Sequence, residues 1–316
     1  MRYSKKITLL ILAGMLLLSG AAPAEINELI VDNANMVDER FELVSLVFRL
    51  AERPEYSEEV TAYQKEISET FANFRNQPIV HFAKTLPFGY DAVFKFAVHI
   101  IKENGRFAFI EDIDSLVEDG RWTKETAEAF LDYLNGFYIE TGYAVFYNSH
   151  LPFFEKETEK FIRLTYSYID LDWFDKYVDS NYLRCIYTPS ATKGNYAAVV
   201  NQKYVYCGVA GSGGAIVHEF CHSFSNPLAH KWYEENELFA KWCDESVKWM
   251  RDGGYADALI VACEYITRAY NCLYDLEHSY FEQRNALSQH FSMEWSYGFR
   301  YFEDVFNMVL EYENTH

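Results

Sequence analysis

The sequence predicts an α+β fold that is mainly α-helical, with one small antiparallel sheet in its second half. Apolar residues recur at spacings of three and four along most of the chain, which is the period of an amphipathic helix. Around residues 183–209 the pattern changes to short β-branched and aromatic runs divided by turn residues, which is typical of strands. Half of the 316 residues are apolar, so the chain can bury a substantial core.

The first 24 residues have the pattern of an export signal. Three basic residues precede an apolar run over residues 7–18, and Ala22-Pro23-Ala24 is the small-residue pattern that a signal peptidase reads. The apolar run is about 12 residues long, whereas a membrane span needs about 20. We therefore expect an exported protein, periplasmic or secreted, without an integral membrane span.

Residues 25–180 are predicted to form a mainly helical N-terminal region. Thr123 is the expected N-cap of one helix, because its hydroxyl can accept a hydrogen bond from the first helical turn. No linker rich in Gly, Ser or Pro ends this region, so residues 25–316 are also compatible with a single domain. Helical spacing is clearest in five segments, which are 41–51, 60–74, 89–102, 125–137 and 155–168.

Residues 181–316 form the second predicted region, which begins with the small sheet. Turn residues near Gly194 and Asn201 divide the apolar runs, so we expect two or three antiparallel strands. All six cysteines fall in this region, and at least two of them are expected to be simple buried thiols. A disulfide between Cys185 and Cys207 would require their two segments to pair as strands. No C-x-x-C pair indicates a cysteine-ligated metal.

A helix is predicted directly after the sheet. The glycine-rich turn over residues 211–214 frees the backbone to enter a helix over 215–224. Asn226-Pro227 is expected to stop that helix, because proline lacks an amide hydrogen and clashes with the preceding turn. Later helices are predicted over 238–250, 255–273 and 299–312.

The charge balance argues against nucleic acid as a partner. The chain has 28 Lys and Arg against 47 Asp and Glu, a net charge of −19, and no basic patch that would neutralise phosphates. Aromatic residues make up 18% of the chain, which indicates a large aromatic core, or else a Tyr-rich cleft for peptides or glycans.

One motif carries chemistry, and it is His218-Glu219-Phe220-Cys221-His222, the pattern H-E-x-x-H. Residues four apart on a helix lie about 40° apart around its axis, so both imidazoles can reach one metal ion. Glu219 projects close enough to contact a water molecule on that metal without binding the metal itself. Zinc in such a site lowers the pKa of its water toward about 7, so a nucleophile is available near neutrality.

The order of strand, glycine turn and H-E-x-x-H helix resembles the zincin metallopeptidases over about residues 183–270. The resemblance implies a zincin-like catalytic region in which His218 and His222 bind zinc and Glu219 is the general base. It also implies that the strand before the helix lines the substrate cleft. The chain further resembles an uncharacterised family of exported bacterial proteins that carry a domain of unknown function. That likeness lies in the strings HEFCHSFSNPL (218–228), EYITRA (264–269) and GFRY (298–301).

A zinc site needs a third protein ligand, which leaves one position for water. The metzincin extension is absent, because Ser225 and Leu228 occupy its Gly and His positions. We therefore expect a glutamate from a later helix, as in gluzincins. Glu264 is the first choice, because an acid on that apolar helix would be costly without a partner. An ion pair with Arg268 is the alternative partner for Glu264. Other candidate ligands are Glu245 and, less favoured, Glu277 and His278.

The tetrahedral intermediate of amide hydrolysis also needs hydrogen-bond donors, and zinc supplies part of this stabilisation. Tyr297, His290 and Arg268 are candidate donors, and no spacing rule chooses among them. Asp257 or Asp244 could accept a hydrogen bond from a zinc-binding histidine and so orient it.

These observations predict an exported zinc metallopeptidase that acts on a peptide or protein substrate, with Glu219 as general base. The alternative is a catalytically inactive zincin-fold module that binds peptides or glycans. An intact Glu219 favours the enzyme, because a binding module has no need of the base. Hydrolysis of a non-peptide amide by the same zinc chemistry is a third reading.

Overall fold

The computed structural model describes residues 36–86, 90–110, 113–117, 120–200, 203–209, 213–250, 255, 257–278 and 284–315. The predicted export signal lies outside these residues, as do Asn201 of the second predicted turn and the first two residues of the glycine-rich turn. Within the described part the chain is mainly helical with two small sheets, which confirms the predicted fold class. None of the helices found there is both long enough and apolar enough to cross a bilayer.

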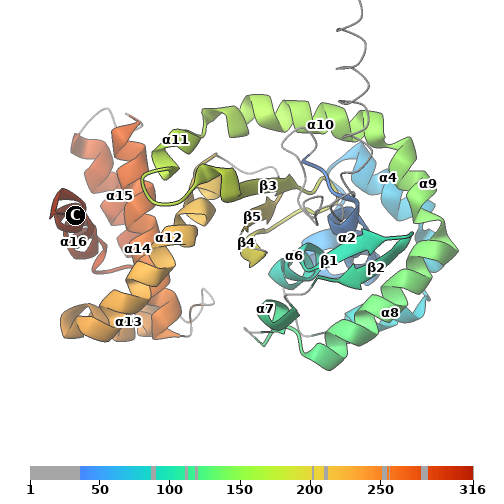
Figure 1. Cartoon of the computed structure of the whole chain (residues 1–316), viewed down its shortest axis with the longest axis horizontal. Helices are drawn as coiled ribbons and strands as arrows, with labels where there is room; N and C mark the ends of the chain where they lie inside the picture. Colours follow the sequence, from blue (N-terminus) through green and yellow to red (C-terminus); the bar gives the residue numbers. More distant parts are fainter. Residues whose placement is uncertain are drawn as a thin grey trace, which may run out of the picture.

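Most helices of the N-terminal region lie with α2 on one side of the molecule, whereas α10 runs along one edge toward α11, which packs against α12 (Gly213–Glu235) (Figure 1). Thr123 is the N-cap of α8, as predicted, and its side chain accepts a hydrogen bond from the Thr126 amide. The helices are α2 (Glu39–Leu50), α3 (Pro54–Ser57), α4 (Ala62–Thr70), α5 (Pro78–Thr85), α6 (Tyr90–Val98), α7 (Ile113–Val117), α8 (Lys124–Thr141), α9 (Tyr143–Ser149), α10 (Leu151–Leu164) and α11 (Leu171–Phe174), with short 3₁₀ turns at Ala72–Phe74, Tyr166–Tyr168 and Ser180–Tyr182.

A β-hairpin replaces the end of the helix predicted over residues 89–102. Helix α6 ends at Val98, and β1 (Ile100–Glu103) then pairs antiparallel with β2 (Arg106–Phe109). Asn104 and Gly105 connect them with φ values of 50° and 79°, the left-handed conformation that tight two-residue hairpin turns require. The Asn-Gly pair therefore overrides the helical spacing of the apolar residues before it.

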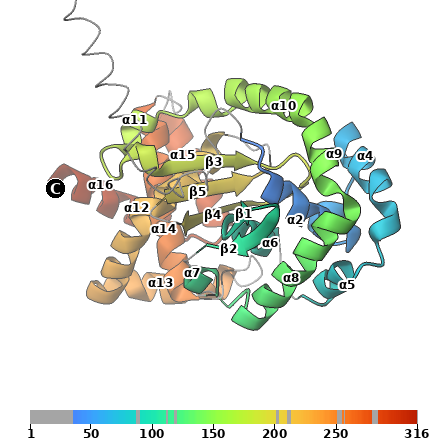
Figure 2. The same ribbon diagram turned by 45° about the vertical axis from the view of Figure 1, so that its right-hand side comes forward.

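The three-stranded sheet lies between the two groups of helices, with its strands in the order β3, β5, β4 (Figure 2). β4 (Asn195–Val200) and β5 (Lys203–Gly208) form the expected antiparallel hairpin. β3 (Leu183–Tyr187) runs parallel to β5, so the prediction of an entirely antiparallel sheet is wrong. The chain crosses from one edge of the sheet to the other between β3 and β4, and strand composition does not encode such a crossing.

The segments of Cys185 and Cys207 pair as strands, but no disulfide joins them, and all six cysteines are free thiols. Cys185 is in register with Tyr206, whereas Cys207 is in register with Ile186. Because aligned residues share a face and successive residues alternate, the two thiols project to opposite faces of the sheet.

Buried side chains of the N-terminal helices hold the connection between β3 and β4. Arg49 on α2 donates through Nη2 to the carbonyl oxygen of Ser190 at 2.7 Å. Gln64 on α4 donates through Nε2 to the carbonyl oxygens of Pro189 and Ala191 at 3.0 and 3.1 Å. These bonds satisfy backbone groups that would otherwise be buried without partners.

The C-terminal helices form the other side of the molecule, and the first of them continues through a proline. Pro227 lies inside α12, so the prediction that Asn226-Pro227 ends this helix is wrong. Beyond the proline, Trp232 packs against Phe239 and Tyr312 at ring-centroid distances of 6.1 and 5.7 Å, and this packing offsets the lost hydrogen bond. The helices are α12 (Gly213–Glu235), α13 (Glu237–Met250), α14 (Ala258–Glu277), α15 (Arg284–Ser296) and α16 (Phe302–Thr315).

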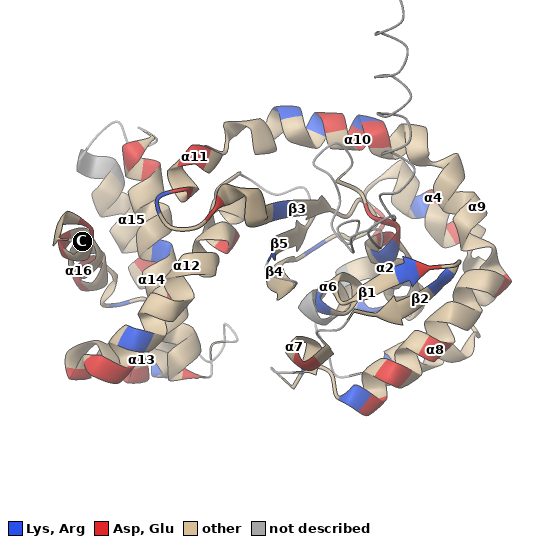
Figure 3. Ribbon diagram, in the orientation of Figure 1, with Lys and Arg blue, Asp and Glu red and all other residues tan. Residues whose placement is uncertain are grey.

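One continuous cluster of buried apolar residues runs from Met36 to Val309 and joins both groups of helices through the sheet. Aromatic rings supply most of its largest side chains, including Trp122, Tyr206 and Tyr265, as the composition predicted. Many charged residues lie along the outer helices, and acidic and basic positions are mixed on α10, whereas those of α8 are mostly acidic (Figure 3).

Candidate metal centre

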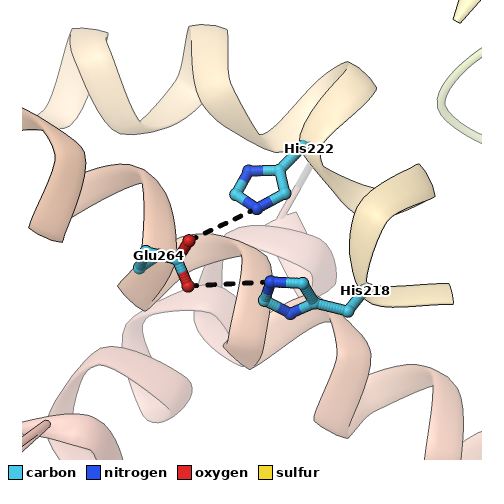
Figure 4. Close-up of side chains that lie close together, drawn as sticks. All are labelled: His218, His222 and Glu264. Carbon is cyan, nitrogen blue, oxygen red and sulfur yellow. Dashed lines mark ion pairs between the residues drawn. The ribbon is translucent and has the colours of Figure 1, made fainter. Parts of the chain in front are cut away.

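His218, His222 and Glu264 converge on one point between helices α12 and α14 (Figure 4). The two histidine rings lie one turn apart on α12, with centroids 4.9 Å apart. Glu264 reaches them from α14, with Oε2 3.6 Å from His218 Nε2 and Oε1 3.6 Å from His222 Nε2. One ligand atom from each side chain lies within 4.8 Å of the others, so the group could hold a metal ion.

The buried face of α12 fixes the direction of both histidines. Ile216, Val217, Phe220 and Cys221 are buried, whereas the side chains at 218, 219 and 222 are partly exposed. Because a helix turns once every 3.6 residues, burying these four positions leaves both histidines on one face.

Hydrogen bonds to the second ring nitrogen orient His222. Its Nδ1 lies 2.8 Å from Asn226 Oδ1 and 2.9 Å from Thr267 Oγ1, and Ser225 shares a hydrogen bond of 2.6 Å with Thr267. An amide oxygen can only accept, so Nδ1 carries the proton and Nε2 keeps its lone pair on the side of Glu264. The ring is therefore held in the tautomer that binds a metal through Nε2.

Neither Asn226 nor Thr267 was among the residues predicted to orient a histidine. Asp257 instead caps α14 by accepting from the Leu259 amide, and Asp244 accepts from the Tyr233 hydroxyl. Helical spacing in the sequence could have indicated both residues, because Asn226 lies one turn after His222 and Thr267 lies almost one turn after Glu264.

The protonation state of His218 also suits a metal ligand. Burial, and then the nearby charges of His222 and Arg268, hold the pKa of His218 well below its usual range. A neutral imidazole keeps the lone pair that binds a cation. Two imidazoles and one carboxylate form a donor set that fits a divalent transition metal such as zinc.

Glu264 also forms an ion pair with Arg268, which is the alternative partner that the sequence suggested for this glutamate. Arg268 Nε lies 3.2 Å from Glu264 Oε2. The same guanidinium donates through Nη1 to both oxygens of Glu294, at 3.3 and 3.0 Å. The carboxylate of Glu264 thus faces the histidines on one side and an arginine on the other.

Glu219 is partly exposed, and no described residue forms a hydrogen bond with its carboxylate. Burial raises the pKa of Glu219 to about 7, the charge of His222 opposes this shift, and the charge of Glu264 adds to it. A carboxylate without a fixed partner and with such a pKa can both take and return a proton near neutrality.

Tyr204 on β5 is a further residue that the sequence analysis did not single out. Its side chain is 8% exposed, yet its hydroxyl forms no hydrogen bond with a residue that the structure describes. Burial, followed by the charge of Glu219, raises the pKa of Tyr204 well above its usual range, and Glu264 adds to the shift. The phenol therefore lies within electrostatic range of both carboxylates as a neutral donor.

The other candidate ligands lie in different surroundings. Glu245 accepts a short hydrogen bond from Tyr301. Glu277 accepts from Trp173 Nε1 at 3.0 Å, and His278 lies 2.9 Å from Asp170. None of these three belongs to the group formed by His218, His222 and Glu264.

The candidate oxyanion donors differ in position. Tyr297 is 59% exposed on the turn after α15, and His290 Nε2 faces Glu294 at 3.7 Å. Arg268 lies closest to the metal group, but its guanidinium is already held by two carboxylates.

The strand that leads into α12 is the central strand of the sheet. β5 has both edges paired, whereas β4 pairs with β5 on one side and with no described strand on the other. An extended peptide can add only to a strand with an unpaired edge. The described sheet has two such strands, β3 and β4, and β4 is the one that packs against α12.

The metal group, its orienting residues and Glu219 all lie on two packed helices, α12 and α14. No family model, no curated protein and no solved structure matches this chain.

Proposed function

We propose that this chain is an exported, zinc-dependent peptidase that hydrolyses peptide bonds with Glu219 as general base. The convergence of His218, His222 and Glu264 beside that carboxylate is the observation that carries the proposal. Two histidines and one glutamate are a donor set that catalytic zinc sites use, with one position left for water. The metal, when bound, supplies Lewis-acid chemistry that acidifies water and polarises a carbonyl group.

The chain's own residues then perform the proton transfers. Glu219 takes the proton from the attacking water and later delivers it to the leaving amine. The positive charge of a bound ion would lower the pKa of Glu219, which favours the ionised form that a base needs. Tyr204 is a neutral phenol on the strand before α12, and we propose it as a donor to the oxygen that gains charge.

The edge of β4 can hold the backbone of an extended substrate by hydrogen bonds. Backbone pairing of this kind favours a peptide over a compact small amide, because only a chain presents a row of donors and acceptors. Backbone pairing does not by itself select particular side chains of the substrate.

The test compares the mature wild-type chain with Glu219→Gln. Zinc content is measured by elemental analysis, and hydrolysis is followed on unfolded casein by the appearance of new amino termini. We expect about one zinc per chain in both proteins. Hydrolysis should fall by about 10²- to 10⁴-fold in the variant, because glutamine cannot accept the proton. Equal zinc with equal hydrolysis would remove Glu219 from the mechanism. Zinc without hydrolysis by the wild type would favour the binding module.

A further inference from the structure

Arg268 lies between two carboxylates, and only one of them belongs to the metal group. Its Nε contacts Glu264 Oε2 at 3.2 Å, while its Nη1 contacts the Glu294 carboxylate at 3.0 Å. The guanidinium plane also stacks on Phe299, with Cζ 4.4 Å from the ring centroid. Three different contacts therefore fix one side chain.

The contact with Glu264 falls on one oxygen only. Oε2 accepts the Arg268 hydrogen bond and also faces His218 Nε2 at 3.6 Å, whereas Oε1 faces His222 Nε2 at 3.6 Å and accepts no hydrogen bond from Arg268. We propose that Arg268 is a positioning residue, which holds Oε2 so that the Glu264 carboxylate offers a bound cation a single oxygen. A carboxylate held in this way fills one coordination position instead of two and leaves another position open for water or substrate. The inference rests on the proposed metal site.

Glu294 makes such an arginine compatible with a nearby cation. It is only 3% exposed, and it accepts from Arg268 through both oxygens. A buried arginine without this partner would repel a divalent ion across Glu264. Glu294 and His290 both lie on α15, where His290 Nε2 is 3.7 Å from Glu294 Oε1 and the His290 ring packs on Phe302.

The geometry needs the planar fork of arginine, and charge alone does not replace it. An arginine can present Nε to one carboxylate and Nη1 to another at once, whereas the ammonium group of lysine is a point charge on a flexible stem. Glutamine keeps an N–H donor but has no charge. Arg268→Lys and Arg268→Gln therefore separate positioning from electrostatics.

The experiment uses the mature chain with Co²⁺ as the probe. The affinity for Co²⁺ is measured by competition with a chromogenic chelator, and the visible d–d absorption reports how many ligands the ion has, since that absorption weakens as ligands are added. Arg300→Lys is the matched control. Arg300 also stacks on aromatic rings, at 4.3 Å from Trp249 and 4.8 Å from Trp295, but it is not in contact with Glu264.

We expect Arg268→Lys and Arg268→Gln each to weaken Co²⁺ binding by about 10- to 100-fold. Both should also lower the visible absorption, because the released carboxylate can bind through two oxygens. Arg300→Lys should match the wild type in both measurements. This combined result would support positioning by Arg268.

Other results would overturn the proposal that Arg268 positions the Glu264 carboxylate. If lysine preserves affinity while glutamine tightens binding, Arg268 acts by charge alone. If both variants lower the melting temperature but leave spectrum and affinity unchanged, its role is structural. A wild-type chain that binds neither Co²⁺ nor Zn²⁺ would refute the metal site itself, and this inference with it.

Discussion

Asn226 lies one helical turn after His222, and its side-chain oxygen Oδ1 lies 2.8 Å from the ring nitrogen Nδ1 of His222. The bond leaves Nε2 as the unprotonated nitrogen on the side of Glu264. Both residues come from α12, and Asn226 directly precedes the proline inside that helix.

Asn226→Leu is therefore expected to weaken zinc binding by about 10- to 100-fold, because the ring loses the acceptor that fixes its tautomer and orientation. The measurement is zinc affinity by chelator competition. Asn314→Leu, on the exposed end of α16, is the control and should not change affinity. Unchanged affinity in Asn226→Leu would mean that Thr267 alone orients His222.

Glu264 and Glu245 give a direct test of the third ligand. Glu264→Ala should reduce bound zinc from about one per chain to a small fraction, because only two protein ligands remain. Glu245→Ala should keep the zinc, since its partner is the Tyr301 hydroxyl. Elemental analysis of the two purified variants decides this, and the reverse pattern would disprove the ligand assignment.

Tyr204→Phe should lower kcat by about 10- to 100-fold and leave zinc content unchanged, because it removes a donor without touching the ligands. Tyr133→Phe, on the exposed side of helix α8, is the control. Steady-state kinetics on a fluorogenic peptide provide the readout. A variant with wild-type kcat would exclude Tyr204 from catalysis.

Glu42, on α2, predicts a specific dependence of stability on pH. Its carboxylate is fully buried and accepts hydrogen bonds from Tyr63 at 2.6 Å and from the Ser190 hydroxyl at 2.9 Å. Burial outweighs these bonds and raises its pKa from 4.5 to about 7. The folded state thus keeps a proton that the unfolded chain releases, and its contribution to stability, fully present below pH 4.5, is lost as the pH rises to about 7.

The loss amounts to about 3 kcal/mol, at 1.36 kcal/mol for each pKa unit. Glu42→Gln should remove this dependence on pH. The free energy of unfolding of the variant should therefore rise relative to that of the wild type between pH 5 and pH 8. Urea denaturation of both proteins at the two pH values measures the difference. A constant difference in the free energy of unfolding would show that Glu42 is already ionised in the folded chain.

The sequence predicted much of the metal centre for a simple reason. The geometry of His218 and His222 follows from helical periodicity alone, and the cost of burying an unpaired acid identified Glu264. The orienting role of Asn226 was missed because we read Asn226-Pro227 as the end of a helix. Packing beyond the proline by Trp232 is a tertiary effect that local propensity does not contain.

The fold shows the same division between local and distant causes. Thr123 was identified as an N-cap because capping depends on a few adjacent residues. The parallel pairing of β3 with β5 depends on how the chain crosses the sheet, so no local pattern predicts it. At the first hairpin, the Asn104-Gly105 pair is a local turn signal, but the prediction followed the helical spacing of the apolar residues before it.

The bonds from Arg49 and Gln64 to the connection between β3 and β4 bear on how the protein can be divided. A fragment beginning at residue 181 would keep every proposed ligand and lose every one of these anchors. Its carbonyl groups at 189–191 would lose these hydrogen bonds. The sheet that packs against α12 would then lose the contacts that hold the connection between two of its strands. Residues 25–180 contain no proposed ligand, yet the metal centre in residues 181–316 depends on them. Removing them should abolish metal affinity, as mutating a histidine ligand should.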